Sequence, residues 1–84
     1  PAAPDAELLY YQGAIFSDCG LQPAALRMLR AAVEQNYCSY SNLQNDPLLR
    51  KLRQTPDFAK LLQSAKDCQQ TNLSPNNNTD IQGP

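Results

Sequence analysis

Residues 24–37 read AALRMLRAAVEQNY, and this stretch decides the fold of the chain. Apolar side chains recur in it at the three-and-four spacing of one helical face: Leu26, Leu29, Ala32, Val33 and Tyr37. Pro23 comes just before it, at the position where a helix begins and no backbone donor is needed. Ala25 and Ala32 are small enough to let another helix approach closely. The stretch therefore predicts an amphipathic helix packed against a neighbour.

The preceding segment predicts a first helix whose apolar residues also fit a period of 3.6: Leu8, Leu9, Ile15, Phe16 and Cys19. Asp5 is suited to cap its start. Gly13 interrupts it, and an interior glycine costs about 1 kcal/mol against alanine, so we expect a neighbouring helix to pass too close for a side chain there. Gly20 stands where a left-handed residue ends a helix. The short connection to Pro23 then makes the two helices antiparallel.

Two shorter helices are expected in the second half of the chain. Residues 38–45 are interpreted as a connecting segment of about one irregular turn, with Ser39 or Ser41 as a possible cap. Asp46-Pro47 and Thr55-Pro56 each place a capping residue before a proline. The first pair predicts a helix with Leu48, Leu49 and Leu52 that runs to about Gln54, and the second a helix with one apolar stripe: Phe58, Leu61, Leu62 and Ala65.

Nowhere does the sequence show strand-like alternation bounded by turns, so the predicted fold class is all-α. We expect two longer helices to form a hairpin and two shorter ones to close over it. The predicted organisation is a linker stub (1–5), a helical hairpin (6–37), a connecting segment (38–45), C-terminal capping helices (46–70) and a disordered tail (71–84).

Composition argues against catalysis and against metal binding. The chain has 84 residues, a net charge of −1, three cysteines and no histidine. No Gly-rich phosphate loop is present, and no motif pairs Ser17 or a cysteine with a base, so we expect neither an enzyme nor a cofactor. The cysteines are odd in number and widely spaced, which favours three small, partly buried side chains over a disulfide framework or zinc site: Cys19, Cys38 and Cys68. One disulfide with a free thiol is the alternative.

No apolar run approaches the roughly 18 residues that a membrane span needs. A cytoplasmic location is favoured, with an extracytoplasmic one as the alternative. Because the chain begins at Pro1 without methionine, it is expected to be a piece of a longer protein rather than a processed one.

Six positions in residues 6–37 carry a family resemblance. Leu9, Gly13 and Phe16 give a large, a small and an aromatic residue in the first helix, and the second has its own small, large and small positions: Ala25, Leu29 and Ala32. In this spacing the segment resembles one tetratricopeptide repeat, a 34-residue helix-turn-helix unit. Gln12 departs from the pattern where an aliphatic residue is usual, and Tyr37 departs where the repeat often ends in proline.

Residues 45–62 read NDPLLRKLRQTPDFAKLL and are similar to the elements that close such arrays in bacterial regulatory proteins, where the array follows a kinase or DNA-binding domain. Short helices with apolar stripes suit a capping role, because a stacked repeat leaves an apolar face at its end. The resemblance implies an α-solenoid fragment: a non-catalytic protein–protein interaction or scaffolding module at the C-terminal end of a repeat array.

The resemblance also implies a peptide-binding surface on the inner face of the first helix: Glu7, Tyr10, Ala14, Ser17 and Asp18. Tyr10 is the main expected contact, because an exposed amphipathic ring gives a large contact area. The alternative is that Tyr10 and Tyr11 pack against a preceding repeat. Because an isolated repeat leaves one side open, self-association is expected through another face of the same helix: Leu8, Tyr11 and Ile15.

All seven basic residues lie between Arg27 and Lys66, in a segment with only three acidic residues. Six of them are candidates for a basic patch that binds an acidic partner or nucleic acid: Arg27, Arg30, Arg50, Lys51, Arg53 and Lys60. Nucleic acid is the less favoured partner, because the leucines of residues 48–52 are needed for the core and no glycine marks the connecting turn. A solvated charged face is the simplest interpretation.

Overall fold

The computed structural model describes residues 4–73, and over this range it contains helices and no strands. In chain order the elements are α1 (Pro4–Asp18), α2 (Gln22–Glu34), α3 (Tyr40–Asn45), the 3₁₀ helices η1 (Pro47–Leu49) and η2 (Leu52–Gln54), and α4 (Pro56–Leu73). The predicted all-α class is confirmed. Residues 71–73 continue α4 instead of starting a tail, whereas residues 1–3 of the expected stub and residues 74–84 lie outside the described residues.

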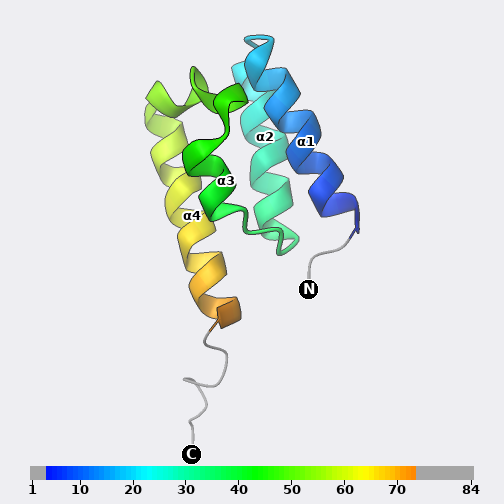
Figure 1. Ribbon diagram of the computed structural model, residues 1–84, viewed down its shortest axis with the longest axis vertical. Coiled ribbons are helices and arrows are strands. Elements are labelled where there is room, and N and C mark those ends of the chain that lie inside the picture. The colour runs from blue at the N-terminus through cyan, green and yellow to red at the C-terminus, as the bar shows by residue number, and fades with distance from the viewer. Residues whose placement is uncertain (1–3, 74–84) are drawn as a thin grey trace, which may run out of the picture.

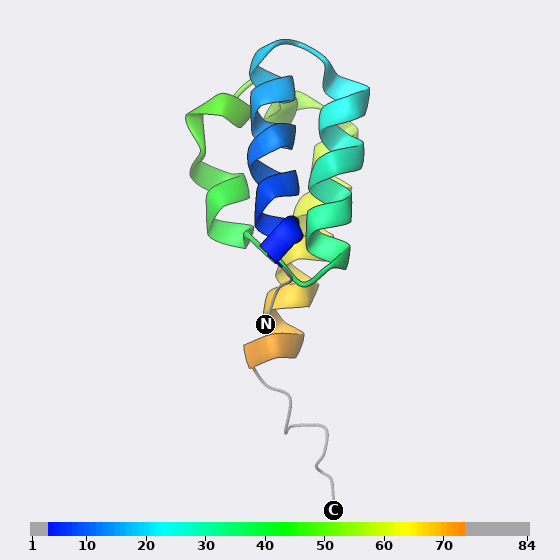
Figure 2. The same cartoon turned by 90° about the vertical axis from the view of Figure 1, so that its right-hand side faces the viewer.

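The four α-helices surround one core (Figures 1 and 2). α1 and α2 run antiparallel beside each other, and α4 lies on the far side of the molecule from α1, with α2 and α3 between them (Figure 1). Seen from the side of α1, α2 flanks it on one edge and the α3–η1 segment on the other (Figure 2). One face of α1 therefore points away from the rest of the chain.

Glycines set the geometry of the α1–α2 hairpin, as the sequence predicted. A side-chain carbon added at Gly13 would lie 2.9 Å from Cγ of Leu29, so α2 does pass too close for a side chain. Gly20 has φ of +85° and ends α1 in the left-handed conformation. Its amide donates to the Ser17 carbonyl at 2.9 Å and the next amide, of Leu21, to the Phe16 carbonyl at 2.9 Å. This is a Schellman turn, which reverses the chain within a few residues.

A second turn of the same kind ends α2. Asn36 takes the left-handed conformation, with φ of 74°. Its amide donates to the Val33 carbonyl at 2.9 Å, and the Tyr37 amide to the Ala32 carbonyl at 2.9 Å. Asparagine tolerates this conformation better than most residues other than glycine. The turn carries Tyr37 back against the core, although the helix has already ended at Glu34.

The expected helix over residues 48–54 is instead a pair of 3₁₀ helices. Asp46 caps the first as predicted, since its Oδ1 accepts a hydrogen bond from the Leu48 amide at 3.0 Å. Leu49 is the last residue of η1 and Leu52 the first of η2, and both are fully buried. Each of the two short helices therefore contributes one leucine to the core.

α4 is the longest helix, with 18 residues, and not one of two shorter elements. Thr55 caps it as predicted: its Oγ1 accepts a hydrogen bond from the Phe58 amide at 3.3 Å. Phe58, Leu61 and Ala65 are buried at a spacing of three and four, and they pack against the core formed by α2 and α3. The predicted stripe is therefore correct, except that Leu62 is only partly buried.

Cys38 and Cys68 form a disulfide, and Cys19 is a free, exposed thiol. The preferred interpretation of three unpaired cysteines is therefore wrong, and the alternative of one disulfide is correct. The bond joins the segment after α2 to the second half of α4, across 30 positions of sequence and 5.5 Å between Cα atoms. Past Ala65 the described side chains of α4 are exposed or only partly buried, so the disulfide holds its last turns in place.

Candidate functional site

The side chain of Tyr10 lies inside the molecule. It is 1% exposed, and its hydroxyl donates a hydrogen bond to Oδ2 of Asp46 at 2.7 Å, across 36 positions of sequence. Burial raises the pKa of Tyr10 far above its ordinary value, and the hydrogen bond to Asp46 raises it further. The Tyr37 ring packs beside it, with 5.6 Å between centroids. Tyr10 thus joins α1 to the residue that begins η1.

The same junction uses Arg53. Its guanidinium donates to the Leu43 carbonyl at 2.7 Å and to the Asp46 carbonyl at 2.9 Å. The Leu43 carbonyl lies in the last turn of α3, where carbonyls lack a partner within the helix, and the Asp46 carbonyl also accepts from the Leu49 amide at 3.0 Å. Hydrogen bonds from a charged donor are stronger than neutral ones. Arg53 therefore stabilises the turn between α3 and η1.

Three of the five residues expected to line a peptide-binding surface on α1 are not accessible. Tyr10, Ala14 and Ser17 are all buried, whereas Glu7 and Asp18 are exposed. The reason is that η1 packs against α1, so the chain's own residues occupy this side of the helix. Among the described residues, the fully buried Ser17 hydroxyl has no hydrogen-bond partner.

One face of α1 carries three large side chains that are exposed, in contrast to the buried Tyr10. Leu8, Tyr11 and Ile15 are 53%, 50% and 54% exposed, and their spacing of three and four aligns them along the helix. We call these three residues the α1 stripe. Of the five apolar residues of α1 that fit the 3.6-residue period, Leu8, Ile15 and Cys19 are exposed, whereas Leu9 and Phe16 pack against the core.

Acidic groups border the α1 stripe. Asp5, Glu7 and Asp18 are exposed and α1 contains no basic residue. The Tyr11 hydroxyl donates to Oε2 of Glu7, one turn earlier, at 2.8 Å, and this hydrogen bond raises the pKa of Tyr11. The bond orients the Tyr11 ring along the helix. The stripe is therefore an apolar surface with a negative border.

The six residues of the expected basic patch divide into two groups. Arg53 is partly buried, and its guanidinium donates hydrogen bonds to the two carbonyls described above. The other five are exposed, on α2, on the link between η1 and η2, and on α4: Arg27, Arg30, Arg50, Lys51 and Lys60. The patch thus loses one member to the fold, and the rest is compatible with a solvated charged face.

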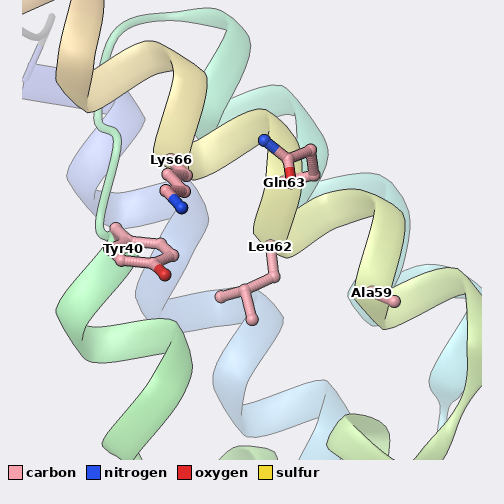
Figure 3. Close-up of a pocket in the computed structure, with 5 residues that line it drawn as sticks. All are labelled: Tyr40, Ala59, Leu62, Gln63 and Lys66. Carbon is pink, nitrogen blue, oxygen red and sulfur yellow. The ribbon is translucent and has the colours of Figure 1, made fainter.

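A shallow pocket of about 170 Å³ lies between α3 and α4. Leu62 and Ala59 supply its apolar lining, and Tyr40, Gln63 and Lys66 supply its polar atoms. Figure 3 shows the Lys66 ammonium and the Tyr40 ring at one end, with Leu62 beside them and Ala59 at the other end. We call this the α3–α4 pocket. Tyr40 and Lys66 lie far apart in the sequence, so no local pattern indicated a pocket here.

Two further contacts differ in the signal that the sequence carries for them. Cys68 follows Leu61 and Ala65 at the spacing of the buried stripe of α4, a position that favours an inward-facing sulfur. Asp46 was recognised as a cap, but nothing in the sequence indicated that its second oxygen accepts from Tyr10. A capping residue with two oxygens can serve the backbone and a distant side chain together.

Residues 4–73 contain no group of three or more His, Cys, Asp or Glu side chains placed to hold a metal ion. Within the same range, no helix is long and apolar enough to cross a membrane. Comparison of the chain with protein-family models, with curated proteins and with solved structures gave no match. The two surfaces, the α1 stripe and the α3–α4 pocket, are therefore the features from which function can be argued.

Proposed function

We propose that this chain is a non-catalytic protein–protein interaction module, the C-terminal end of a tetratricopeptide-like helical array, and that the α1 stripe is the surface that contacts the neighbouring helical hairpin. The observation that carries the proposal is the exposure of about half of Leu8, Tyr11 and Ile15 in one line on a helix whose other side is buried. Contiguous exposed apolar residues mark interaction sites on soluble proteins.

The packing of α1 on α2 supports the proposed repeat. Leu29 leaves no room for a side chain at Gly13, and Ala25 and Ala32 are fully buried. These are the small and large positions on which the resemblance rests. Because α1 is acidic, the hairpin that covers the stripe should carry basic residues around its own apolar positions. The Cys38–Cys68 disulfide favours an oxidising compartment over the cytoplasm.

The size of the stripe indicates what kind of contact it makes. A fully buried large apolar side chain contributes about 1.5–3 kcal/mol, so three half-exposed ones have roughly 3 kcal/mol still to gain. That is less than two free proteins lose in translational and rotational freedom on association. Within one array the hairpins are covalently linked and this loss is much smaller. The stripe therefore suits a neighbour in an array, and free copies should associate only weakly.

The test is an NMR concentration series on the free chain. Between about 50 μM and 2 mM, affinities in the millimolar range shift the amide signals of the interacting residues. We expect such shifts along the α1 stripe and their loss in the double variant Leu8→Ser, Ile15→Ser. Leu48→Ser is the matched control, because Leu48 is 38% exposed on η1. Signals that stay fixed over the whole series would contradict the proposal, as would equal loss in the control.

A further inference from the structure

The α3–α4 pocket is distinct from the α1 stripe and does not depend on it. Its volume of about 170 Å³ decides what can occupy it. Cofactors and drug-sized ligands need sites of roughly 300–1,000 Å³. A cavity of about 150 Å³ accommodates a molecule the size of benzene. The pocket therefore fits one aliphatic side chain and the polar group next to it.

The pocket is lined by two side chains that can donate a hydrogen bond, Tyr40 and Lys66. The Tyr40 oxygen already accepts a hydrogen bond from Nε2 of Gln44 at 3.3 Å, so its own proton remains to be donated. Within the described residues, no oxygen accepts a hydrogen bond from the Lys66 ammonium, which lies near the Tyr40 ring (Figure 3). No acidic residue lines the pocket. Two donors, one of them charged, favour a carboxylate.

Nearby contacts keep a competing carboxylate away. Asp67 follows Lys66 directly, but its Oδ1 accepts a hydrogen bond from Nε2 of Gln63 at 3.0 Å, and it does not line the pocket. The Gln63 amide is therefore held along the helix. Leu62 and Ala59 leave an apolar surface beside the donors.

We propose that the α3–α4 pocket binds the C-terminal residue of a partner polypeptide, with a branched aliphatic side chain on Leu62 and Ala59 and its carboxylate hydrogen-bonded to Lys66 and Tyr40. An internal segment fits less well, because neighbouring side chains of an extended chain point to opposite sides. A C-terminal residue carries its side chain and its carboxylate on the same Cα. Capture of a terminal carboxylate is a known mode of peptide recognition.

The experiment is a titration of the full, disulfide-intact chain with the pentapeptide GSGSL, followed by amide NMR. We expect millimolar binding, with shifts concentrated at Tyr40, Leu62, Gln63 and Lys66. The same peptide with a C-terminal amide should bind about threefold more weakly or worse, because an exposed ion pair contributes up to about fivefold in affinity. The peptide GSGSS, which lacks the aliphatic side chain, should also lose affinity.

Single substitutions test which side chains donate hydrogen bonds to the peptide carboxylate. Lys66→Gln should weaken GSGSL binding about threefold, whereas Lys60→Gln, on the same helix outside the pocket, should leave it unchanged. Tyr40→Phe removes only the hydroxyl and should also weaken binding. Equal binding of the free acid and the amide would overturn the proposal, and so would equal binding of an internal sequence, GSGLEGSG-amide. Absence of shifts at the pocket with about 10 mM peptide would overturn it too.

Discussion

Tyr10 and Tyr11 are adjacent in the sequence, and each donates its hydroxyl proton to a carboxylate at nearly the same distance, 2.7 and 2.8 Å. Their surroundings differ completely, since Tyr10 is 1% and Tyr11 50% exposed. The acceptor of Tyr11 is Glu7, one turn away in the same helix, and that of Tyr10 is Asp46, on another element. The first bond orients a surface ring; the second joins two parts of the fold.

Truncation of each tyrosine to alanine should give the largest difference in stability between the two positions. Tyr10→Ala removes a buried aromatic ring, which typically costs about 3–5 kcal/mol, a large share of the stability of a small domain. Tyr11→Ala removes a ring from the surface and should change the free energy of unfolding by less than about 0.5 kcal/mol. Urea denaturation followed by circular dichroism measures both. Similar losses in the two variants would contradict the structure.

Removal of the disulfide should lower stability without altering the contrast between the tyrosines. Closing a loop of 30 residues stabilises a fold by about 3–4 kcal/mol in the chain-entropy model. We expect the double variant Cys38→Ser, Cys68→Ser to lose an amount of this order, and the turns of α4 beyond Ala65 to exchange their amide hydrogens faster. Cys19→Ser is the matched control and should have little effect, because that thiol is exposed.

Removing only the two hydroxyl groups measures what each tyrosine hydrogen bond contributes to stability. Tyr10→Phe keeps the ring but deletes the bond to Asp46, and hydrogen bonds to charged groups contribute about 1.5–3 kcal/mol. Tyr11→Phe deletes an exposed bond within one helix, which contributes about 0.5 kcal/mol or less. The measurement is the shift of the denaturation midpoint at neutral pH. A Tyr10→Phe variant as stable as the parent chain would show that the buried bond contributes nothing net.

Alkaline pH should separate the two residues by charge. The folded-state pKa of Tyr10 is raised above its unfolded value of about 10, first by burial and then by Asp46. The stability that this shifted pKa contributes is therefore fully present below pH 10. As the pH rises above that value, the free energy of unfolding falls by up to about 1.4 kcal/mol per pH unit. Because Tyr11 also titrates high, the informative quantity is the stability of the parent chain minus that of Tyr10→Phe. A constant difference above pH 10 would contradict this prediction.

Features that depend on neighbouring residues were predictable from the sequence. Gly13, Gly20 and the caps at Asp46 and Thr55 act through the local backbone or through one close contact, and the structure has them as expected. The inner face of α1 was not predictable from hydrophobicity. Its small residues, Ala6, Ala14 and Ser17 among them, are buried while larger apolar ones are exposed, because close packing selects for volume as well as polarity.

The features that the sequence did not indicate bring together residues far apart in the chain. Tyr10 with Asp46, Cys38 with Cys68 and Tyr40 with Lys66 each depend on how the helices are arranged, which hydrophobic spacing does not encode. The disulfide was also not the preferred prediction, because three cysteines cannot all be paired within one chain. The proposal of a tetratricopeptide-like array rests on the residue spacing within one hairpin. Its test is whether a second hairpin packs on the α1 stripe.

The disulfide also determines how the chain responds to tension. Residues 38–68 form a covalent loop, so a force applied at the two ends of the chain bypasses everything between the two cysteines. The hairpin of α1 and α2 has no such bond and would be the first part to extend. Thirty residues of extended chain measure about 100 Å, which remains hidden from the pulling force until the sulfur–sulfur bond is reduced. Under tension, the residues inside this loop would extend only after a reductant had cleaved the disulfide.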